Sequence, residues 1–387
     1  MGQTLRPRDI ARLRLHSHGL LPGADGFPRP GFEDPEDVVR WMTAMQGQDW
    51  YSVPWSLGAR LVFGADSPAQ ARSASAAAVR QAFQDGRIVR SWPMRGTLHT
   101  LLPEDLALFH SLTSDRLISS MAARHRELAI TAADGEKARD AVHGTLRGGG
   151  RATRAELFAA LEDAKQGTRT QRGAHLLLLL SVTGTLVQGP VGEKEHLFVL
   201  QDEWIGDRRR ELSPEAALDE LLERYVRSHG PATLRDFAWW TGLTLTACRA
   251  AQGRLGARLR EYESPFHGDG LLLSSETADW LERRNGEALP GARSFHLLAG
   301  FDEYILGYTD RSAVLAPEHF DLIVPGGNGM FKRTTMSGGI TDGTWSTDSR
   351  GTVVLQPFEV NGTHPTPHRS SSKWSRAYER FVDAQRM

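Results

Sequence analysis

The sequence of 387 residues contains very little cysteine, because Cys248 is the single one. One thiol excludes an intramolecular disulfide, and it also excludes a cysteine-rich zinc site. We expect Cys248 to be a small buried residue. A chain without disulfides fits a reducing cytosol.

The sequence also lacks an excess of charge of one sign and a long apolar run. Lys+Arg 46 against Asp+Glu 47 gives a formal net charge of -1, so a nucleic-acid surface would require local clustering of cations. The most apolar run, residues 176–180, is far shorter than the roughly 20 residues that cross a bilayer. Residues 1–20 alternate arginines with leucines and contain no apolar core of a secretory signal. We therefore expect a cytoplasmic protein without membrane contact.

Three common catalytic or nucleotide-binding motifs are missing. The sequence has no H-E-x-x-H, no G-x-G-x-x-G after a strand and no G-x-x-x-x-G-K-[ST] loop. The 14 histidines are scattered, and the pair His16/His18 falls in a predicted N-terminal arm. We predict no metal and no cofactor.

Helical and strand patterns alternate in a rhythm that occurs three times. A chain of this length is expected to form two to four modules. Apolar residues at helical spacing follow the start signal Asp34-Pro35, and two short strand patterns follow three helical ones. Three helices and a β-hairpin make a winged helix-turn-helix. In the first copy, the predicted helices are 35–45, 55–63 and 76–84, and the predicted strands are 87–92 and 97–102, joined by 93–96.

The second and third copies repeat this order. Thr153 and Glu156 have the spacing of a capping box at the start of one helix of the second copy. The second copy has predicted helices 137–146, 154–161 and 173–183 and a wing within 186–200. The third copy has predicted helices 214–228, 233–241 and 244–258 and wing strands 259–263 and 271–274.

From residue 294 onward the sequence becomes rich in glycine and strand-forming residues. The predicted strands are 295–298, 330–335, 339–340 and 353–355, and a terminal helix is predicted over 374–385. We therefore predict an α+β fold of three tandem winged helix-turn-helix modules and a β-rich C-terminal element. The predicted boundaries are 1–130, 131–212, 213–290 and 291–387.

Repeated winged helices favour nucleic-acid binding, because such modules place a helix or a wing against phosphates and grooves. Arginines recur at the end of the third module's last helix, and guanidinium groups suit phosphate recognition. These residues are Arg249, Arg254, Arg258 and Arg260. Two alternatives remain: a winged helix that binds protein, and arginines that are merely solvated.

Gln46 and Gln48 flank Gly47 where the first helix is expected to end. Alternate residues of an extended segment share a face, so the two amides could point into one cavity. Primary amides can hold a water molecule without carrying charge. The alternative interpretation is two exposed amides in a loop.

The first predicted wing carries Arg95, Thr97 and His99 near its tip. Arg95 could bind a phosphate and His99 could contact a sugar or a base. A hydrogen-bonded hairpin turn is the alternative. Residues 300–304 and 308–311 gather carboxylates, a phenol and a guanidinium, which favours a structural Asp/Arg network at a module junction over catalytic carboxylates. Asp49 is likewise either an electrostatic helper or a surface carboxylate.

These motifs together resemble the AlkZ-type family of tandem winged-helix DNA glycosylases. The resemblance is carried by Gln46-Gly47-Gln48, by residues 94–99, by residues 300–308 with Asp310-Arg311, and by residues 328–332. It covers nearly the whole chain in the same order. One departure is Gly47, because the family usually has a larger apolar residue there.

The resemblance implies a concave DNA-binding surface and hydrolysis of the N-glycosidic bond of alkylated purines, with crosslinks or bulky adducts as further substrates. It makes Gln46 and Gln48 the catalytic pair and adds Arg311 and Lys332 to the residues expected to contact DNA. It implies repair or self-resistance to a toxin, a β-hairpin that probes DNA, and a monomer acting on double-stranded DNA that contains alkylated bases. Two alternatives are a non-catalytic DNA-binding or regulatory protein and an interaction scaffold without nucleic-acid affinity.

Overall fold

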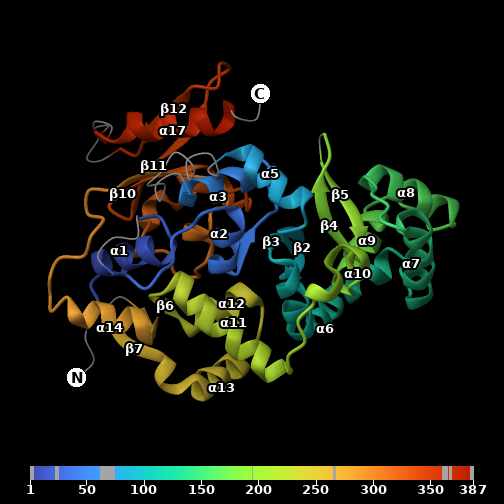
Figure 1. Ribbon diagram of the computed structural model, residues 1–387, viewed down its shortest axis with the longest axis horizontal. Helices are drawn as coiled ribbons and strands as arrows, with labels where there is room; N and C mark the ends of the chain where they lie inside the picture. Colours follow the sequence, from blue (N-terminus) through green and yellow to red (C-terminus); the bar gives the residue numbers. More distant parts are fainter. Residues whose placement is uncertain are drawn as a thin grey trace. The chain divides into compact units, whose positions relative to one another are not determined.

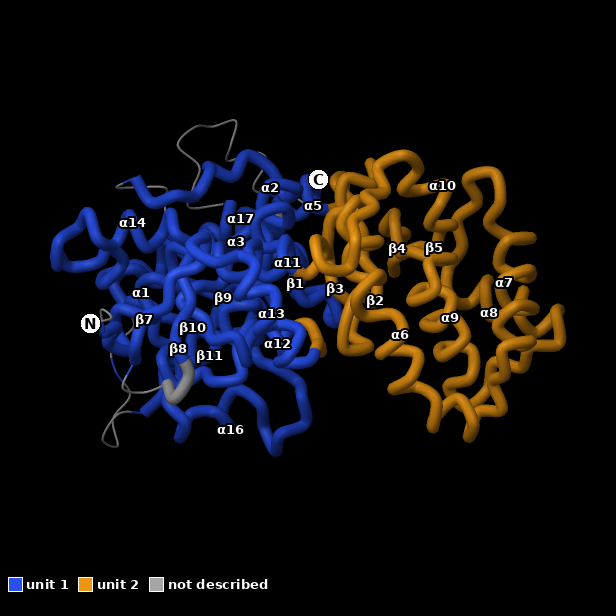
Figure 2. Tube along the Cα trace, turned by 90° about the horizontal axis from the view of Figure 1, so that it is seen from below, with its two compact units in different colours: residues 1–79, 219–240, 244–387 blue, residues 80–218, 241–243 orange. Residues whose placement is uncertain are grey.

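The computed structural model describes residues 4–21, 26–61, 75–193, 195–264, 267–359, 365 and 368–383. The chain forms two compact units (Figure 2). Unit 1 contains residues 1–79, 219–240 and 244–387, and unit 2 contains residues 80–218 and 241–243. The four predicted modules group the chain differently, since residues of both the first and the second belong to unit 2. Their boundaries stay a prediction.

Unit 2 combines a helical bundle with two β-hairpins (Figure 1). It begins within α5 (Ala76–Gln84), which leads into the first hairpin. The elements that follow are β2 (Val89–Met94), β3 (Thr97–Leu101), α6 (Pro103–Glu127), α7 (Ala132–Leu146), α8 (Arg154–Asp163), α9 (Arg172–Val182), β4 (Leu186–Val191), β5 (His196–Leu200), α10 (Gln201–Ile205) and the short 3₁₀ helix η1 (Gly206–Arg208).

The two hairpins of unit 2 belong to one antiparallel sheet in which the strands lie in the order β3, β2, β4, β5. The hairpins meet at Arg90 and Gln188, where the Arg90 guanidinium donates to Gln188 Oε1 at 2.6 Å. Each predicted wing is therefore joined to the other along one edge.

The helices of unit 2 begin where the sequence provides caps. Thr153 and Glu156 form the predicted capping box at the start of α8, and Thr131 and Asp134 form another at α7. Such boxes satisfy backbone N–H groups that have no partner within the helix. The core between these helices and the hairpin β4–β5 is mostly leucine. The three helices predicted for the second copy are present, although α7 begins at Ala132 and not at 137, and so are the two strands of its predicted wing. Their arrangement as a winged helix stays a prediction.

Unit 1 is assembled from three separate stretches of chain. The first contributes α1 (Pro7–Ser17), α2 (Pro35–Met42), β1 (Ala44–Gln46) and α3 (Val53–Leu61). The second contributes most of α11 (Pro214–His229), with β6 (Ala232–Thr233) and α12 (Leu234–Thr241). The third contributes α13 (Leu245–Leu255), η2 (Gly256–Arg258), β7 (Leu259–Ser264), β8 (His267–Ser274), α14 (Ser275–Arg283), β9 (Phe295–Leu298), α15 (Glu303–Leu306), η3 (Pro317–His319), α16 (Phe320–Ile323), η4 (Pro325–Gly327), β10 (Thr334–Ser337), β11 (Ile340–Thr347), β12 (Val353–Pro357) and α17 (Ser371–Asp383).

Two antiparallel sheets organise unit 1. One has the strand order β6, β8, β7, and the other has the order β12, β11, β10, β9. A large apolar core joins α1 to residues from the far end of the chain, among them Tyr262, Tyr304 and Phe358. The core of unit 1 therefore joins residues that are distant in sequence.

Several expectations need correction. The helix predicted over 35–45 ends at Met42, because Thr43 has a left-handed φ of 72°, and Met45 lies in β1 instead. The predicted N-terminal arm is α1, and both His16 and His18 are buried. The strand predicted over 330–335 begins only at Thr334. The 25-residue helix α6 was not predicted. The ends of two predicted helices, residues 62–63 and 384–385, lie outside the described residues.

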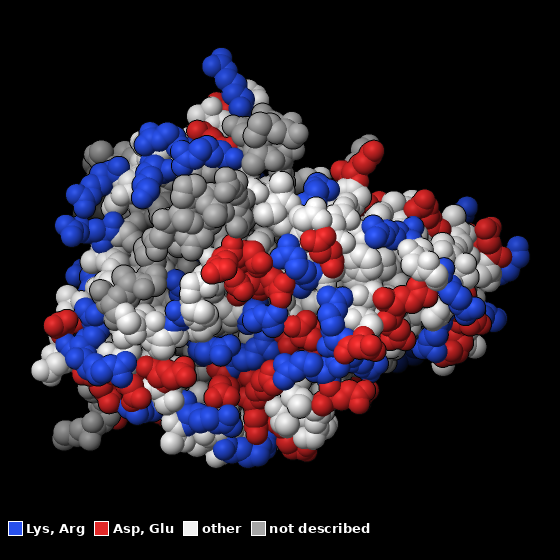
Figure 3. All heavy atoms as spheres, in the orientation of Figure 1, with Lys and Arg blue, Asp and Glu red and all other residues white. Residues whose placement is uncertain are grey.

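Other expectations are confirmed. Cys248 is buried, and burial raises the pKa of its thiol to about 11. No helix in the described part of the chain is long and apolar enough to cross a membrane. Acidic and basic side chains are intermixed over much of the face drawn in Figure 3.

Candidate functional site

Gln46 lies at the end of β1 in unit 1, and its backbone is held from a distant part of the chain. The Gln46 N–H donates to Glu303 Oε1 at 2.7 Å. Gln46 is half-buried and Gln48 is exposed. The side-chain Oε1 of Gln46 is buried and accepts no hydrogen bond from the residues that the structure describes. Several other buried side-chain atoms also lack a partner among the described residues, so it is the place of this oxygen at the end of β1, next to Gln48, that makes it a candidate site for a bound water.

Glu303 itself is almost completely buried, with 1% of its surface exposed. Its second oxygen, Oε2, accepts from Trp240 Nε1 at 3.1 Å and lies 3.7 Å from His229 Nε2. Burial lowers the pKa of His229, and the neighbouring Glu303 opposes that shift. A buried carboxylate is costly unless several donors satisfy it. Here one of those donors is the backbone of a predicted catalytic residue.

The neighbouring Asp302 forms a buried ion pair with Arg60. Arg60 donates to both carboxylate oxygens, at 2.9 and 3.0 Å, and both side chains are at most 1% exposed. Asp302 also accepts from the backbone N–H of Tyr304 at 2.9 Å and so caps α15, the helix that carries Glu303. Asp302 thus belongs to a structural Asp/Arg pair, but its partner is Arg60 and not Arg311 of the predicted set.

A chain of buried aromatic and imidazole groups continues from this pair. The Tyr308 hydroxyl donates to the carbonyl of His229 at 2.6 Å and therefore accepts from His18 Nε2 at 2.7 Å. His18 thus carries its proton on Nε2, and burial keeps its pKa well below the usual value. The network holds α1, α11 and the 302–308 segment together behind β1.

The segment after Gln48 is fixed by Asp49. Its carboxylate accepts from the Tyr51 N–H at 3.1 Å and from the Ser52 hydroxyl at 2.6 Å, just before α3. Gly300 passes so close that an added Cβ would lie 3.1 Å from Ser52 Oγ. Tyr51 stands out as an exposed aromatic side chain, with 77% of its surface accessible.

The residues of the first wing that are predicted to contact DNA lie in unit 2. Arg95 and Gly96 both have positive φ, 54° and 69°, as the two central residues of a type I′ turn do. His99 is buried and donates from Nδ1 to the Thr97 carbonyl at 3.0 Å, which leaves Nε2 as the acceptor for Arg95 at 3.4 Å. The structure therefore brings these three residues together in a hydrogen-bonded hairpin.

The four arginines predicted on the last helix of the third module lie in unit 1, but only Arg249 and Arg254 belong to α13, since Arg258 lies in η2 and Arg260 in β7. Arg254 contacts both oxygens of Asp219, with a shortest distance of 2.6 Å. Arg258 pairs with Glu223 at 3.0 Å, and Arg260 contacts two carboxylates of α14. Arg249 is exposed on α13. A DNA contact by Arg254 would have to replace its existing carboxylate partner.

Arg311 and Lys332 also belong to unit 1. Arg311 donates to the Ile305 carbonyl at 2.8 Å, and three aromatic rings surround its guanidinium at 5.6 to 5.9 Å. Lys332 is exposed. Arg311 therefore also has a structural contact to the helix that begins at Glu303, whereas Lys332 projects from the surface.

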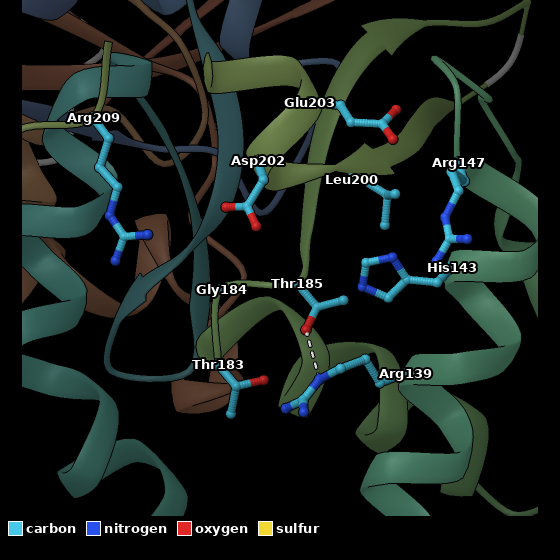
Figure 4. A pocket seen from close by; sticks show the side chains of 10 residues that line it. All are labelled: Arg139, His143, Arg147, Thr183, Gly184, Thr185, Leu200, Asp202, Glu203 and Arg209. Carbon is cyan, nitrogen blue, oxygen red and sulfur yellow. Dashed lines mark hydrogen bonds between the residues drawn. The ribbon is translucent and has the colours of Figure 1, made fainter. Parts of the chain in front are cut away.

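Unit 2 contains a separate cavity of about 470 Å³ (Figure 4). Arg139, His143 and Arg147 project into it from α7 and its end, facing Thr185 and Asp202. Glu203 accepts from the N–H groups of Gly148 and Gly149 at 3.0 and 2.7 Å. The remaining lining residues are Thr183, Gly184, Leu200 and Arg209. The cavity contains charges of both signs and none of the predicted site residues.

The arrangement around β1 accompanies a clear family match. A model of the family described as DNA glycosylase AlkZ-like matches residues 39–381, which include Gln46, Glu303 and most of both units. The chain belongs to the AlkZ-like DNA glycosylase family. The resemblance stated from the sequence motifs is therefore confirmed.

Two similar proteins come from Streptomyces sahachiroi. A curated AlkZ-like relative named Interstrand DNA cross-link repair glycosylase is 27% identical over 332 residues, covering 83% of this chain and 84% of that protein. The solved structure of the S. sahachiroi DNA glycosylase AlkZ superposes with a TM-score of 0.76 at 24% identity, covering 98% of this chain and 97% of that one. The structural match shows that the fold is shared over nearly the full length.

Two features of the candidate site were missed from the sequence. The role of Glu303 was not predicted, although the 300–308 motif was noted, because its contact with Gln46 spans 257 positions. A glutamate next to the apolar run Tyr304-Ile305-Leu306 was the available signal, since a carboxylate in such a run is rarely buried without a function. The exposed Tyr51 has no comparable sequence pattern.

Proposed function

We propose that this AlkZ-like protein is a monofunctional DNA glycosylase that hydrolyses the N-glycosidic bond of N7-alkylated purines, including bulky adducts and interstrand crosslinks. The observation that carries the proposal is the half-buried Gln46, whose backbone is fixed by Glu303 and whose amide oxygen is buried without a protein partner among the described residues. Such an oxygen is suited to accept a hydrogen bond from a water molecule.

The chemistry needs little acid catalysis. An N7-alkylated guanine is cationic and leaves readily, and bond breakage places positive charge on the deoxyribose. Gln46 and Gln48 would hold a water near C1′, where it attacks the oxocarbenium-like carbon as the base departs. The proton released by the water passes to solvent or to the departing base. Placement of this kind contributes up to roughly 7 to 11 kcal/mol in favourable systems.

Neutral amides are adequate because they orient the water without requiring a particular protonation state. No lysine nucleophile takes part, so the product is an intact abasic site, and strand cleavage does not follow. Asp49 acts mainly by holding the turn after Gln48, through its contacts with Tyr51 and Ser52. The exposed Tyr51 ring is suited to stack on a base or a sugar beside the lesion.

Binding of the duplex is proposed to involve the three winged-helix modules and a concave surface that they form. In this proposal Arg95, Thr97, His99, Arg249, Arg254, Arg311 and Lys332 contact the DNA. An open site suits bulky or crosslinked bases, because such bases cannot rotate easily into a tight pocket. The enzyme would act as a cytoplasmic monomer. The S. sahachiroi relative, whose name refers to interstrand cross-link repair, supports this choice of substrates.

The test is release of N7-methylguanine from a duplex under single-turnover conditions. Replacing both Gln46→Ala and Gln48→Ala should reduce the rate by about 100-fold or more, the scale found when a group that stabilises a transition state is removed. Gln81→Ala, an exposed glutamine of α5, is the matched control and should leave the rate unchanged. Undiminished release by the double variant would refute the mechanism.

A further inference from the structure

The C-terminal helix α17 is fixed on unit 1 by one aromatic face. Trp374 and Phe381 are buried, and both rings pack edge-on against Trp55 of α3, at centroid distances of 6.2 and 5.2 Å. At Gly58 of α3 an added Cβ would lie 2.3 Å from the Phe381 ring, so this close approach requires glycine. The helix is therefore a fixed platform and not a loosely attached tail.

A neighbouring face of α17 is cationic and exposed. Lys373, Arg376 and Arg380 recur at intervals of three and four residues, which places them along one side of the helix, and Arg369 precedes them. Figure 3 shows Lys and Arg side chains gathered over the region that α17 occupies in Figure 1. The one carboxylate between these residues, Glu379, accepts from the backbone N–H of Val353 at 3.4 Å.

The arginines of this face differ in their ion pairing from those that follow the middle of α13 in the same unit. Arg254 and Arg258 have carboxylate partners at 2.6 and 3.0 Å. In contrast, Arg376 and Arg380 form no ion pair with any residue that the structure describes. The whole chain has a net charge of -1, so this local excess of positive charge does not reflect its average composition.

We propose that the exposed cationic face of α17 binds the phosphate backbone of duplex DNA. From Lys373 to Arg380 the helix rises about 10 Å, which is close to the length of three base pairs at roughly 3.4 Å each. Guanidinium groups bind phosphates through paired hydrogen bonds. The choice of DNA as the partner rests on the proposed function, but the contact itself is independent of base excision.

The test is equilibrium binding of an undamaged fluorescent duplex at several salt concentrations. Each phosphate contact contributes about 0.9 to the slope of log affinity against log salt concentration. Arg376→Gln combined with Arg380→Gln should therefore lower that slope by about 2. Lys137→Gln combined with Arg154→Gln removes the same number of exposed charges from unit 2 and should lower it by clearly less than 1. Circular dichroism confirms that each variant is folded.

An equal change of slope in both double variants would overturn the proposal, since the effect would then be one of net charge. A second arm uses vesicles of phosphatidylserine and phosphatidylcholine. Loss of vesicle binding by the α17 variant with an unchanged DNA slope would assign the face to a membrane surface and also overturn it. Because the duplex is undamaged, these results do not depend on base release, which the Gln46 and Gln48 variants test separately.

Discussion

Units 1 and 2 are built differently in their interiors. Unit 2 fills the space between its helices mainly with leucines, and ion pairs such as those of Arg139 with Glu136 and of Arg210 with Asp105 have an exposed arginine. Unit 1 buries the ion pair of Arg60 with Asp302 and the carboxylate of Glu303 directly behind β1. Buried charge is expensive, so its concentration behind the predicted catalytic segment indicates that it positions that segment.

The largest expected effect comes from breaking the buried pair of unit 1. Asp302→Ala should lower the free energy of unfolding by about 3 to 5 kcal/mol, because it leaves Arg60 as an unpaired buried charge. Urea unfolding followed by tryptophan fluorescence measures this, since eight of the ten tryptophans belong to unit 1. Glu136→Ala in unit 2 removes an exposed partner and should cost less than about 1 kcal/mol by circular dichroism. Equal losses would remove the contrast between the units.

Acid should destabilise unit 1 through its buried histidines. Burial lowers the pKa of His16 to about 4, so between pH 6.5 and 4 the unfolded state binds more protons than the folded state. Its contribution is complete above pH 6.5 and falls by about 1.4 kcal/mol per pH unit below it. His16→Leu should therefore reduce the loss of stability between pH 6.5 and 5 by about 2 kcal/mol. Urea unfolding at the two pH values gives this difference, and an unchanged difference would contradict the assignment.

A smaller effect is expected for the geometry of the site. In Glu303→Gln one oxygen that now accepts, from Gln46 or from Trp240, becomes an NH₂ group that faces another donor. Hydrogen bonds to charged groups contribute roughly 1.5 to 3 kcal/mol, so release of N7-methylguanine should slow by about tenfold or more. Duplex affinity should stay the same, because Glu303 is buried. A change in affinity with an unchanged single-turnover rate would mean that Glu303 does not position Gln46.

The difference between elements set by local sequence and elements set by distant contacts explains which parts of the fold the sequence could predict. In unit 2 the apolar spacing and the Thr153 capping box determine α8 and α9 locally, so these two helices were expected with nearly correct bounds, whereas the long helix α6 was missed. The helix predicted through Met45 failed at Thr43, where a left-handed residue, φ 72°, ends α2. No local pattern marks that turn. It becomes understandable only from the structure, where β1 is held by Glu303.

In the candidate site, too, the sequence could not predict contacts between distant residues. Gln46, Gln48 and the 300–308 motif were all noted in the sequence, but a separation of 257 positions hid the hydrogen bond from the Gln46 N–H to Glu303. The α13 arginines were expected to be available to DNA, whereas Arg254 and Arg258 are paired with carboxylates on α11 that the sequence could not place beside them. Residue type and spacing were enough to identify the chemical groups of the candidate site. Their hydrogen-bond and ion-pair partners depend on long-range contacts that only the structure shows.

The interleaving of the two units has a consequence for synthesis on the ribosome. Nearly all of unit 2 has emerged once Leu218 is out of the exit tunnel, so its leucine core can close early. Helix α1 is made before unit 2, yet Tyr262, Tyr304 and Phe358 of its core are made after unit 2. Part of the apolar surface of α1 therefore stays uncovered until these later residues have been made. During this period the apolar surface of α1 is a binding site for a chaperone on the nascent chain.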